Sequence, residues 1–116
     1  MYTMASVLNY GSDEQKMRVL PKVAAGETIC AFALTEPEAG SDVAGMRTTA
    51  EPSGDGVVLR GHKAFISNAG VATSYVVFAR EGIPGDKPRF GAFWVPAHAE
   101  GLRVDPIRVI APHPIG

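Results

Sequence analysis

Cysteine is nearly absent from this chain of 116 residues, which contains only Cys30. A single cysteine excludes an intrachain disulfide framework and any multi-cysteine metal site within the chain. It is compatible with a reducing compartment, and we interpret it as a small buried apolar residue. The histidines have no carboxylate or cysteine at metal-ligand spacing, so no metal site is predicted. They are His62, His98 and His113.

The sequence also lacks an excess of charge of either sign and any long apolar run. Eleven basic and twelve acidic residues give a net charge of -1, which leaves no basic surplus for non-specific nucleic-acid binding. No apolar stretch approaches the roughly 18 residues of a membrane-spanning helix, so no membrane insertion is expected. Residues 1–7 lack the basic start and long apolar run of a signal peptide.

What is present is the composition of one globular domain. Hydrophobic residues make up 46% and charged residues 20%, which excludes a wholly disordered chain. The length suits a single core and leaves no room for a two-domain enzyme with a cleft between its domains. Thirteen glycines and nine prolines lie between short apolar runs, a spacing that favours a β domain with many turns.

The first quarter of the sequence predicts a helix that begins at Ser12. Ser12 and Gln15 form a capping-box pattern, followed by apolar residues at three- and four-residue spacing. Pro21 is expected to interrupt or kink this helix or to start a second turn, and Gly26 to end it. The expected apolar face comprises Met17, Leu20, Val23 and Ala24.

The remainder predicts about six or seven strands by its alternating apolar runs and turn signals. Residues 28–34 are apolar and uncharged, as in a strand buried on both faces. Ser-Gly-Asp-Gly at 53–56 predicts a tight turn. Pro106 places the last predicted strand at an edge or bulge. The other expected strands cover residues 46–50, 57–60, 63–67, 75–79, 90–95 and 102–110.

Two segments contain residues that could bind a ligand. In 35–42, hydroxyls at Thr35 and Ser41 flank a turn in which Gly40 permits a backbone shape that other residues resist, and exposed amides there could hold an anion or carbonyl. In 61–70, Phe65 and Ser67 would share one face of a strand, so a planar heteroaromatic ring could stack on one and hydrogen-bond the other. Taken singly, each segment is better explained as an ordinary loop or strand end than as a ligand site.

Taken together, the segments resemble one family. Residues 32–42, Phe-Ala-Leu-Thr-Glu-Pro-Glu-Ala-Gly-Ser-Asp, resemble the signature of acyl-CoA dehydrogenases, and 61–69, Gly-His-Lys-Ala-Phe-Ile-Ser-Asn-Ala, resemble that family's second flavin-contacting strand. Residues 10–16 and 20–27 resemble the helix that precedes its β domain. The resemblance covers nearly the whole chain in order.

The resemblance implies a mainly β fold: a short helical lead-in over 1–27 from the family's N-terminal helical domain, then an antiparallel β-barrel-like middle domain of about six to seven strands over 28–116. It also implies that the chain is a piece of a longer protein, without the C-terminal helical bundle and the final strand of the middle domain. The ending at 111–116, Ala-Pro-His-Pro-Ile-Gly, is consistent with an interruption between strands.

The resemblance further implies FAD as cofactor. Thr35 would bond the pyrimidine edge of the flavin, Ser67 would bond near N5, and Ser41 would also face the acyl-CoA path. Many members carry tryptophan in place of Phe65 and threonine in place of Ser67, and both replacements keep the stacking face or the hydroxyl. The expected cofactor contacts are Phe32, Leu34, Thr35, Gly40, Ser41, Phe65, Ile66 and Ser67.

The family reaction removes a proton from the α-carbon of an acyl-CoA thioester and passes a hydride from the β-carbon to flavin N5. The proton needs a carboxylate base, which in the family lies in the C-terminal bundle, and no residue here matches it. The loop acids Glu36, Glu38 and Asp42 are interpreted as loop-shaping or solvated groups. We therefore expect weak FAD affinity and no turnover from this chain alone.

Further expectations follow from the resemblance: an acyl-CoA substrate in fatty acid metabolism, an electron-transfer flavoprotein or similar acceptor, a homo-oligomer, and a cytoplasmic location, or the mitochondrial matrix in a eukaryote. Two alternatives stay open. One is a related flavoenzyme of the same fold, such as an acyl-CoA oxidase, a nitroalkane oxidase or a flavin monooxygenase. The other is a cofactor-free β module that binds a partner protein or itself.

Overall fold

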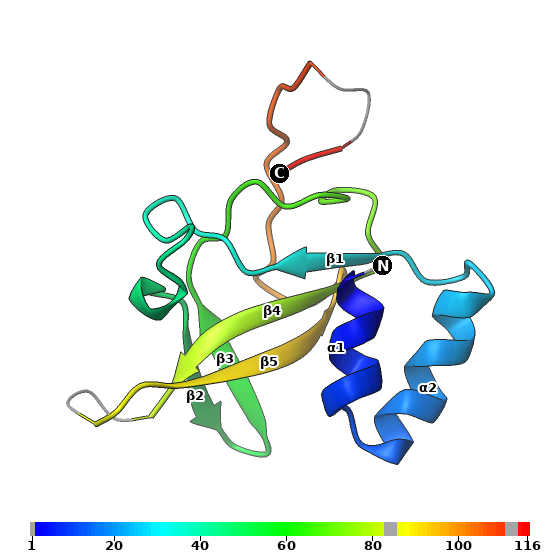
Figure 1. Ribbon diagram of the computed structural model, residues 1–116, viewed down its shortest axis with the longest axis horizontal. Helices are drawn as coiled ribbons and strands as arrows, with labels where there is room; N and C mark the ends of the chain where they lie inside the picture. Colours follow the sequence, from blue (N-terminus) through cyan, green and yellow to red (C-terminus); the bar gives the residue numbers. More distant parts are fainter. Residues whose placement is uncertain (1, 83–85, 111–113) are drawn as a thin grey trace.

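The structure, a computed structural model, describes residues 2–82, 86–110 and 114–116. Two helices precede a sheet of five strands, and the chain is richer in strand than in helix (Figure 1). The elements are α1 (Tyr2–Tyr10), α2 (Asp13–Ala24), β1 (Cys30–Ala33), the 3₁₀ turn η1 (Val43–Gly45), β2 (Thr49–Ser53), β3 (Gly56–Arg60), β4 (Ser74–Glu81) and β5 (Arg89–Pro96).

Helix α2 begins at the predicted cap. The Ser12 hydroxyl accepts a hydrogen bond from the Gln15 amide at 3.2 Å, and the Gln15 side chain accepts one from the Ser12 amide at 2.9 Å. This reciprocal pair satisfies two amides that the first turn leaves without partners. Gly26 follows the helix with a φ of +75°, a left-handed conformation that glycine adopts without strain.

The predicted apolar face of α2 is partly wrong. Met17 is 76% exposed, whereas Val19, outside the predicted set, is buried. Pro21 lies inside the last turn, and the helix continues to Ala24. The described residues contain no helix of the length and apolar character that crossing a membrane requires.

Strand β4 is the centre of the sheet. β5 pairs antiparallel with its whole length, from Ser74 opposite Pro96 to Glu81 opposite Arg89. β1 and β2 therefore share its other edge, both parallel to it. β3 adds an antiparallel hairpin to β2, joined by the two-residue turn predicted at 53–56. The sheet is thus mixed and open, where the sequence predicted an antiparallel, barrel-like arrangement.

Several predicted strands differ from the structure. Residues 102–110 form no strand, and β2 begins at residue 49 instead of 46. Residues 63–67 are not a strand either, because Phe65 has a left-handed φ of +59°. Ser67 forms only an isolated bridge with Ile115. The prediction that Phe65 and Ser67 share one strand face is therefore wrong, and the described residues hold five strands instead of six or seven.

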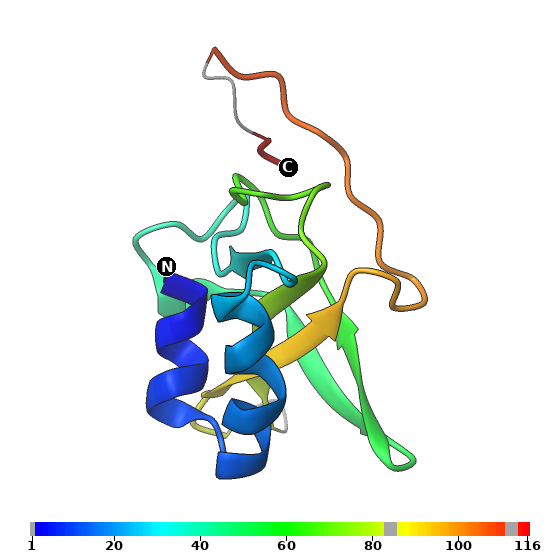
Figure 2. The same cartoon turned by 90° about the vertical axis from the view of Figure 1, so that its right-hand side faces the viewer.

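The two faces of the sheet are covered by different parts of the chain (Figure 2). On one face, the rings of Phe32 and Phe78 pack with centroids 4.9 Å apart. Phe32 lies opposite Val76 in the parallel register, and Val76 lines a cavity together with Val7 of α1 and Val19 of α2, so the helices cover this face. β1 alternates between buried and half-buried residues, so it is not buried on both faces as predicted. The opposite face carries the core cluster of Ala31, Ala33, Ile66, Ala69, Ala72 and Tyr75.

Candidate functional site

The two segments singled out in the sequence lie side by side. The Ala64 amide donates to the Thr35 carbonyl at 2.9 Å. The Asn68 side-chain amide donates to the Cys30 carbonyl at 3.5 Å. Residues 30–35 and 64–68 therefore run in opposite directions past one another, which brings together segments about thirty positions apart in the sequence.

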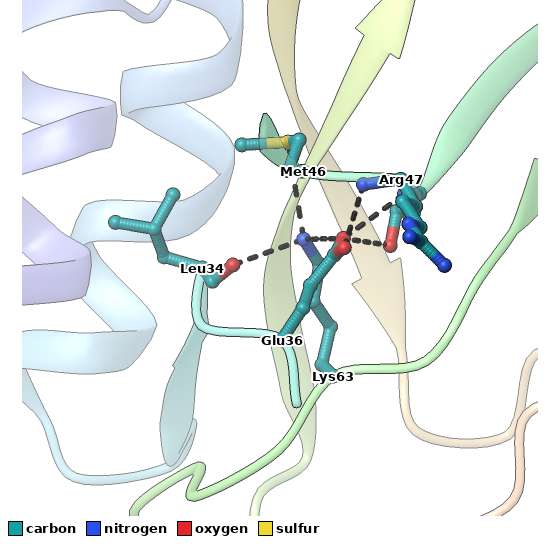
Figure 3. Close-up of polar contacts among 6 residues, drawn as sticks. Leu34, Glu36, Met46, Arg47 and Lys63 are labelled. Atoms are coloured by element: carbon teal, nitrogen blue, oxygen red, sulfur yellow. Dashed lines mark hydrogen bonds and ion pairs between the residues drawn. The ribbon is translucent and has the colours of Figure 1, made fainter. Parts of the chain in front are cut away.

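A buried carboxylate, that of Glu36, organises this region (Figure 3). It accepts hydrogen bonds from the Arg47 amide at 2.6 Å, from the Thr48 amide at 2.9 Å and from the Thr48 hydroxyl. The Lys63 ammonium lies 2.8 Å from the same carboxylate and also donates to the Leu34 carbonyl at 3.0 Å. We call Glu36 and Lys63, with these partners, the Glu36–Lys63 clamp.

The clamp keeps its carboxylate ionised. Burial raises the pKa of Glu36, but the hydrogen bonds outweigh it, first from the Arg47 amide, then from Lys63 and from Thr48. Together they lower the pKa of Glu36 from 4.5 to about 2. A charged group that is almost removed from water is tolerated here because every donor around it is directed at its oxygens.

Local sequence explains how the clamp forms. Glu36 and Ala39 exchange backbone hydrogen bonds at 3.1 and 3.2 Å around Pro37, which folds the chain into a tight turn. Gly61 passes directly over Thr48, so closely that an added Cβ would lie 2.7 Å from the Thr48 Cα. No side chain fits at residue 61, and this close approach brings Lys63 to the carboxylate.

Sequence reasoning missed both Lys63 and Gly61. The available signal was the position of Lys63 immediately before the apolar residues 64–66. In the structure its side chain is only 11% exposed. Glu36, in contrast, is confirmed as a loop-shaping group. Glu38 forms a solvent-exposed ion pair with Arg47 at 2.7 Å.

The second half of the signature turn, around Gly40 and Ser41, is open to solvent. Both residues are exposed. Gly40 does not have a left-handed φ, and within the described part of the chain an added Cβ there would meet no atom within 4 Å. The prediction that Gly40 supplies an unusual backbone conformation is therefore wrong, and neither conformation nor crowding within the chain requires glycine at this position.

The remaining predicted contacts differ in their surroundings. Leu34 and Thr35 are half-buried beside Lys63 and Ala64. The half-buried Phe32 packs on the helix-covered face of the sheet, opposite the face that carries Ile66. The Ile66 amide already donates to the Gly116 carbonyl at 2.6 Å, so any ligand contact through that amide would have to displace this bond.

Phe65 combines exposure with an unusual backbone. Its side chain is 67% exposed, and its φ of +59° is one that a bulky residue rarely adopts. Such a conformation costs on the order of 1–3 kcal/mol and persists only where neighbouring contacts impose it. Here the amides on both sides are held, that of Ala64 by the Thr35 carbonyl and that of Ile66 by the Gly116 carbonyl. Ser67 is exposed next to this segment.

Cys30 is half-buried in β1, and burial raises the pKa of its thiol. Across residues 2–82, 86–110 and 114–116, no group of three or more histidine, cysteine, aspartate or glutamate side chains could hold a metal ion. His113 lies outside the described residues.

Comparisons with known proteins agree with these motifs. Residues 31–113 match the family described as acyl-CoA dehydrogenase, middle domain. An acyl-CoA dehydrogenase of Bacillus subtilis is 40% identical over 98 residues, which cover 84% of this chain and 26% of that protein. The human mitochondrial very long-chain specific acyl-CoA dehydrogenase is 48% identical over 88 residues, covering 74% of this chain and 13% of that protein.

A solved structure shows the same fold. The crystal structure of a glutaryl-CoA dehydrogenase from Mycobacterium smegmatis in complex with FADH2 superposes with a TM-score of 0.86 at 38% identity, covering 97% of this chain and 29% of that one. The chain thus spans about a quarter or less of the length of the two curated relatives described above. With the family match extending over most of its residues, the chain belongs to the acyl-CoA dehydrogenase family and corresponds to its middle domain.

Proposed function

We propose that this chain supplies the flavin-facing side of an FAD-dependent acyl-CoA dehydrogenase. The observation that carries the proposal is Phe65, an exposed aromatic residue held in a left-handed conformation by hydrogen bonds on both sides. Strained backbone of this kind is concentrated at functional sites, because the protein retains it for a purpose other than stability. The FADH2 bound by the related glutaryl-CoA dehydrogenase supports the choice of ligand.

The side chains of this region fit the flavin ring of FAD. Phe65 offers an exposed aromatic side chain, and Ser67 and Thr35 offer hydroxyls on the two adjoining segments. Phe32, Leu34 and Ile66 would contribute packing or backbone contacts, with the Ile66 amide limited by its existing bond. When bound, FAD would accept the hydride in the oxidation of an acyl-CoA thioester.

The open half of the turn suits the phosphates and the substrate. Gly40 and Ser41 are exposed, and no atom of the residues that the structure describes lies within 4 Å of a Cβ added at Gly40. Glycine is therefore dispensable for the fold at this position, whereas close approach of a pyrophosphate or of the acyl-CoA would require it. Ser41 would donate its hydroxyl to the same groups.

The catalytic base is not among the acids of this turn. A general base works best with a pKa near the working pH, and the pKa of Glu36 is lowered to about 2. Its oxygens already accept four hydrogen bonds from Arg47, Thr48 and Lys63. Glu38 is paired with Arg47 at the surface. We therefore propose that the chain alone binds FAD weakly and turns over no substrate.

The remaining proposals concern the whole protein. We propose α,β-dehydrogenation of an acyl-CoA thioester, transfer of electrons to an electron-transfer flavoprotein or a similar acceptor, and assembly as a homo-oligomer. Residues 1–27 would belong to the helical part that precedes the middle domain, which would occupy 28–116. The support is membership of the family, whose human relative is named as very long-chain specific and mitochondrial.

The test is titration of the chain with FAD, followed by quenching of flavin fluorescence, for the natural sequence and for Phe65→Asn. Asparagine tolerates a left-handed φ, so the variant should unfold at the same or a higher denaturant concentration. Its FAD affinity should fall by about tenfold, since loss of stacking costs on the order of 1 kcal/mol or more. Tyr10→Asn, at an 89% exposed position on α1, is the control and should bind normally.

No quenching at millimolar FAD by the natural chain would contradict the proposal and favour the cofactor-free interaction module. Equal FAD affinity of Phe65→Asn and the natural chain would exclude Phe65 as the aromatic contact. Dye-coupled dehydrogenase activity from the chain alone would contradict the assignment of the base to another part of the protein.

A further inference from the structure

Resting on the proposed function, we infer that Lys63 is a positioning residue for the flavin site: its ammonium bridges the Leu34 carbonyl and the Glu36 carboxylate and so fixes the backbone of Thr35 between them. Lys63 itself would touch neither FAD nor substrate. Its effect would pass to the ligand through the hydroxyl of Thr35 and through the adjoining residue Phe65.

Contacts at three consecutive residues hold the backbone around Thr35. Lys63 Nζ lies 3.0 Å from the carbonyl oxygen of the preceding residue, Leu34, and 2.8 Å from a carboxylate oxygen of the following residue, Glu36. The Thr35 carbonyl accepts from the amide of Ala64, the neighbour of Lys63, at 2.9 Å. Residues 34–36 are thus held against 63–64 at three successive positions, which places the two proposed flavin-contacting segments relative to one another.

The role of Lys63 is separable from the rest of the clamp. Three of the four hydrogen bonds to Glu36 come from Arg47 and Thr48, which close the loop that carries the turn. Of the four hydrogen bonds to Glu36, the one from Lys63 comes from the segment leading to Phe65. Removal of the ammonium therefore loosens the junction of the two segments while the loop keeps its own hydrogen bonds.

The burial of the pair supports a positioning role over a purely stabilising one. The side chains of Lys63 and Glu36 are 11% and 5% exposed. Replacing a buried ion pair with apolar residues of similar volume is often neutral or stabilising, so such pairs are weak devices for stability. They are better suited to specifying one arrangement, because each partner accepts only a narrow geometry.

The experiment compares Lys63→Met with Thr48→Val. The first keeps an unbranched apolar stem and removes the ammonium, which lies 4.0 Å from the Met46 sulfur. The second removes the hydroxyl donor to Glu36 and leaves the Lys63 bridge in place. Amide hydrogen exchange measured residue by residue should show faster exchange at Ala64 in Lys63→Met, by about tenfold relative to the amide of Val76 in β4. Thr48→Val should leave this ratio unchanged.

The second readout is FAD itself. Lys63→Met should bind FAD about tenfold more weakly, since a site that must be ordered on binding loses affinity. At saturating FAD, its visible circular dichroism should still differ from that of the natural chain, because the ring then lies in a different environment. A residue that only stabilised the fold would change neither the Ala64-to-Val76 ratio nor the spectrum of the saturated protein.

The outcomes separate the inference from the proposed function. Absence of FAD binding by the natural chain contradicts the proposed function, while the Ala64-to-Val76 ratio still decides whether Lys63 fixes residues 34–36. An unchanged ratio together with unchanged FAD affinity in Lys63→Met overturns the inference alone. If Lys63→Met does not fold, Lys63→Arg replaces it: a planar head cannot reproduce both contacts, so exchange at Ala64 should rise, and an unchanged ratio overturns the inference.

Discussion

The two halves of the turn at residues 35–42 differ in burial and in hydrogen bonding. Glu36 is buried and fully hydrogen-bonded, whereas Glu38, two residues later, lies at the surface with 65% of its side chain exposed. A Cβ added at Gly40 would meet no described atom within 4 Å, whereas a Cβ added at Gly61, on the segment that carries Lys63, would lie 2.7 Å from the Thr48 Cα. One half of the turn is therefore tied into the interior of the chain, and the other half is exposed to solvent.

The largest expected effect is the loss of the buried charge. Glu36→Gln should lower the free energy of unfolding by about 3–5 kcal/mol, because it leaves the ammonium of Lys63 buried without a counter-charge. Glu38→Gln, the matched change in the open half, removes only an exposed pair with Arg47. Urea unfolding of both variants makes the comparison, and equal losses of stability would show that the two halves do not differ.

The second-largest expected effect is destabilisation of the fold by acid, through protonation of Glu36 in the buried half of the turn. The pKa of Glu36 is about 2 in the folded chain against an ordinary 4.5, so its ionisation stabilises the fold fully above about pH 5. This contribution is lost as the pH falls from there through about 2, because the folded state must then take up a proton that it binds weakly. The expected loss is about 3 kcal/mol at most.

The measurement is the free energy of unfolding at several pH values for the natural chain and for Glu36→Gln. Other carboxylates titrate in both proteins, so the difference between the two curves isolates Glu36. We expect the curves to converge toward pH 2. Parallel curves between pH 5 and pH 2 would contradict the depressed pKa of this carboxyl.

Two glycines provide the next contrast. Gly61→Ala should destabilise the fold by about 1–3 kcal/mol or more, because the new Cβ would lie 2.7 Å from the Thr48 Cα. Gly40→Ala meets no atom within 4 Å and should be neutral or slightly stabilising, by up to about 1 kcal/mol. Thermal unfolding of both variants tests this contrast. A large loss of stability in Gly40→Ala would show that residue 40 is as crowded as the buried half of the turn.

The smallest expected effect is at the surface ion pair. Arg47→Gln removes a side chain that is 78% exposed but leaves the Arg47 backbone amide bonded to Glu36. Its unfolding free energy should change by no more than about 1 kcal/mol, and less at high salt. A larger, salt-independent loss in denaturant unfolding would mean that the exposed pair shares in holding the loop.

Local patterns predicted the local elements well. The α2 cap at Ser12, the turn at 53–56 and the strands at 75–79 and 90–95 are confirmed, because each depends on residues close in sequence or on a short run rich in β-branched and aromatic residues. The parallel pairing of β1 with β4 was not predicted, since strand direction depends on partners more than forty residues apart.

The clamp shows where sequence reasoning ends. Glu36 was recognised as loop-shaping from its motif, but its partner Lys63 could not be identified, because contacts between distant segments, such as the close passage of Gly61 over Thr48, bring them together. The left-handed Phe65 was mistaken for a strand residue for a similar reason. Its side chain favours a strand, but the hydrogen bonds that the amides of its neighbours Ala64 and Ile66 donate to the Thr35 and Gly116 carbonyls override that preference.

The most direct test of this account is an amide-resolved NMR titration of the chain with FAD. We predict that the amides of Thr35 and Ser67 shift together and saturate at the same FAD concentration, while those of the β2–β3 hairpin remain unchanged. Shifts confined to the hairpin, or shifts at only one of the two residues, would contradict the claim that these adjoining segments form a single flavin-binding surface.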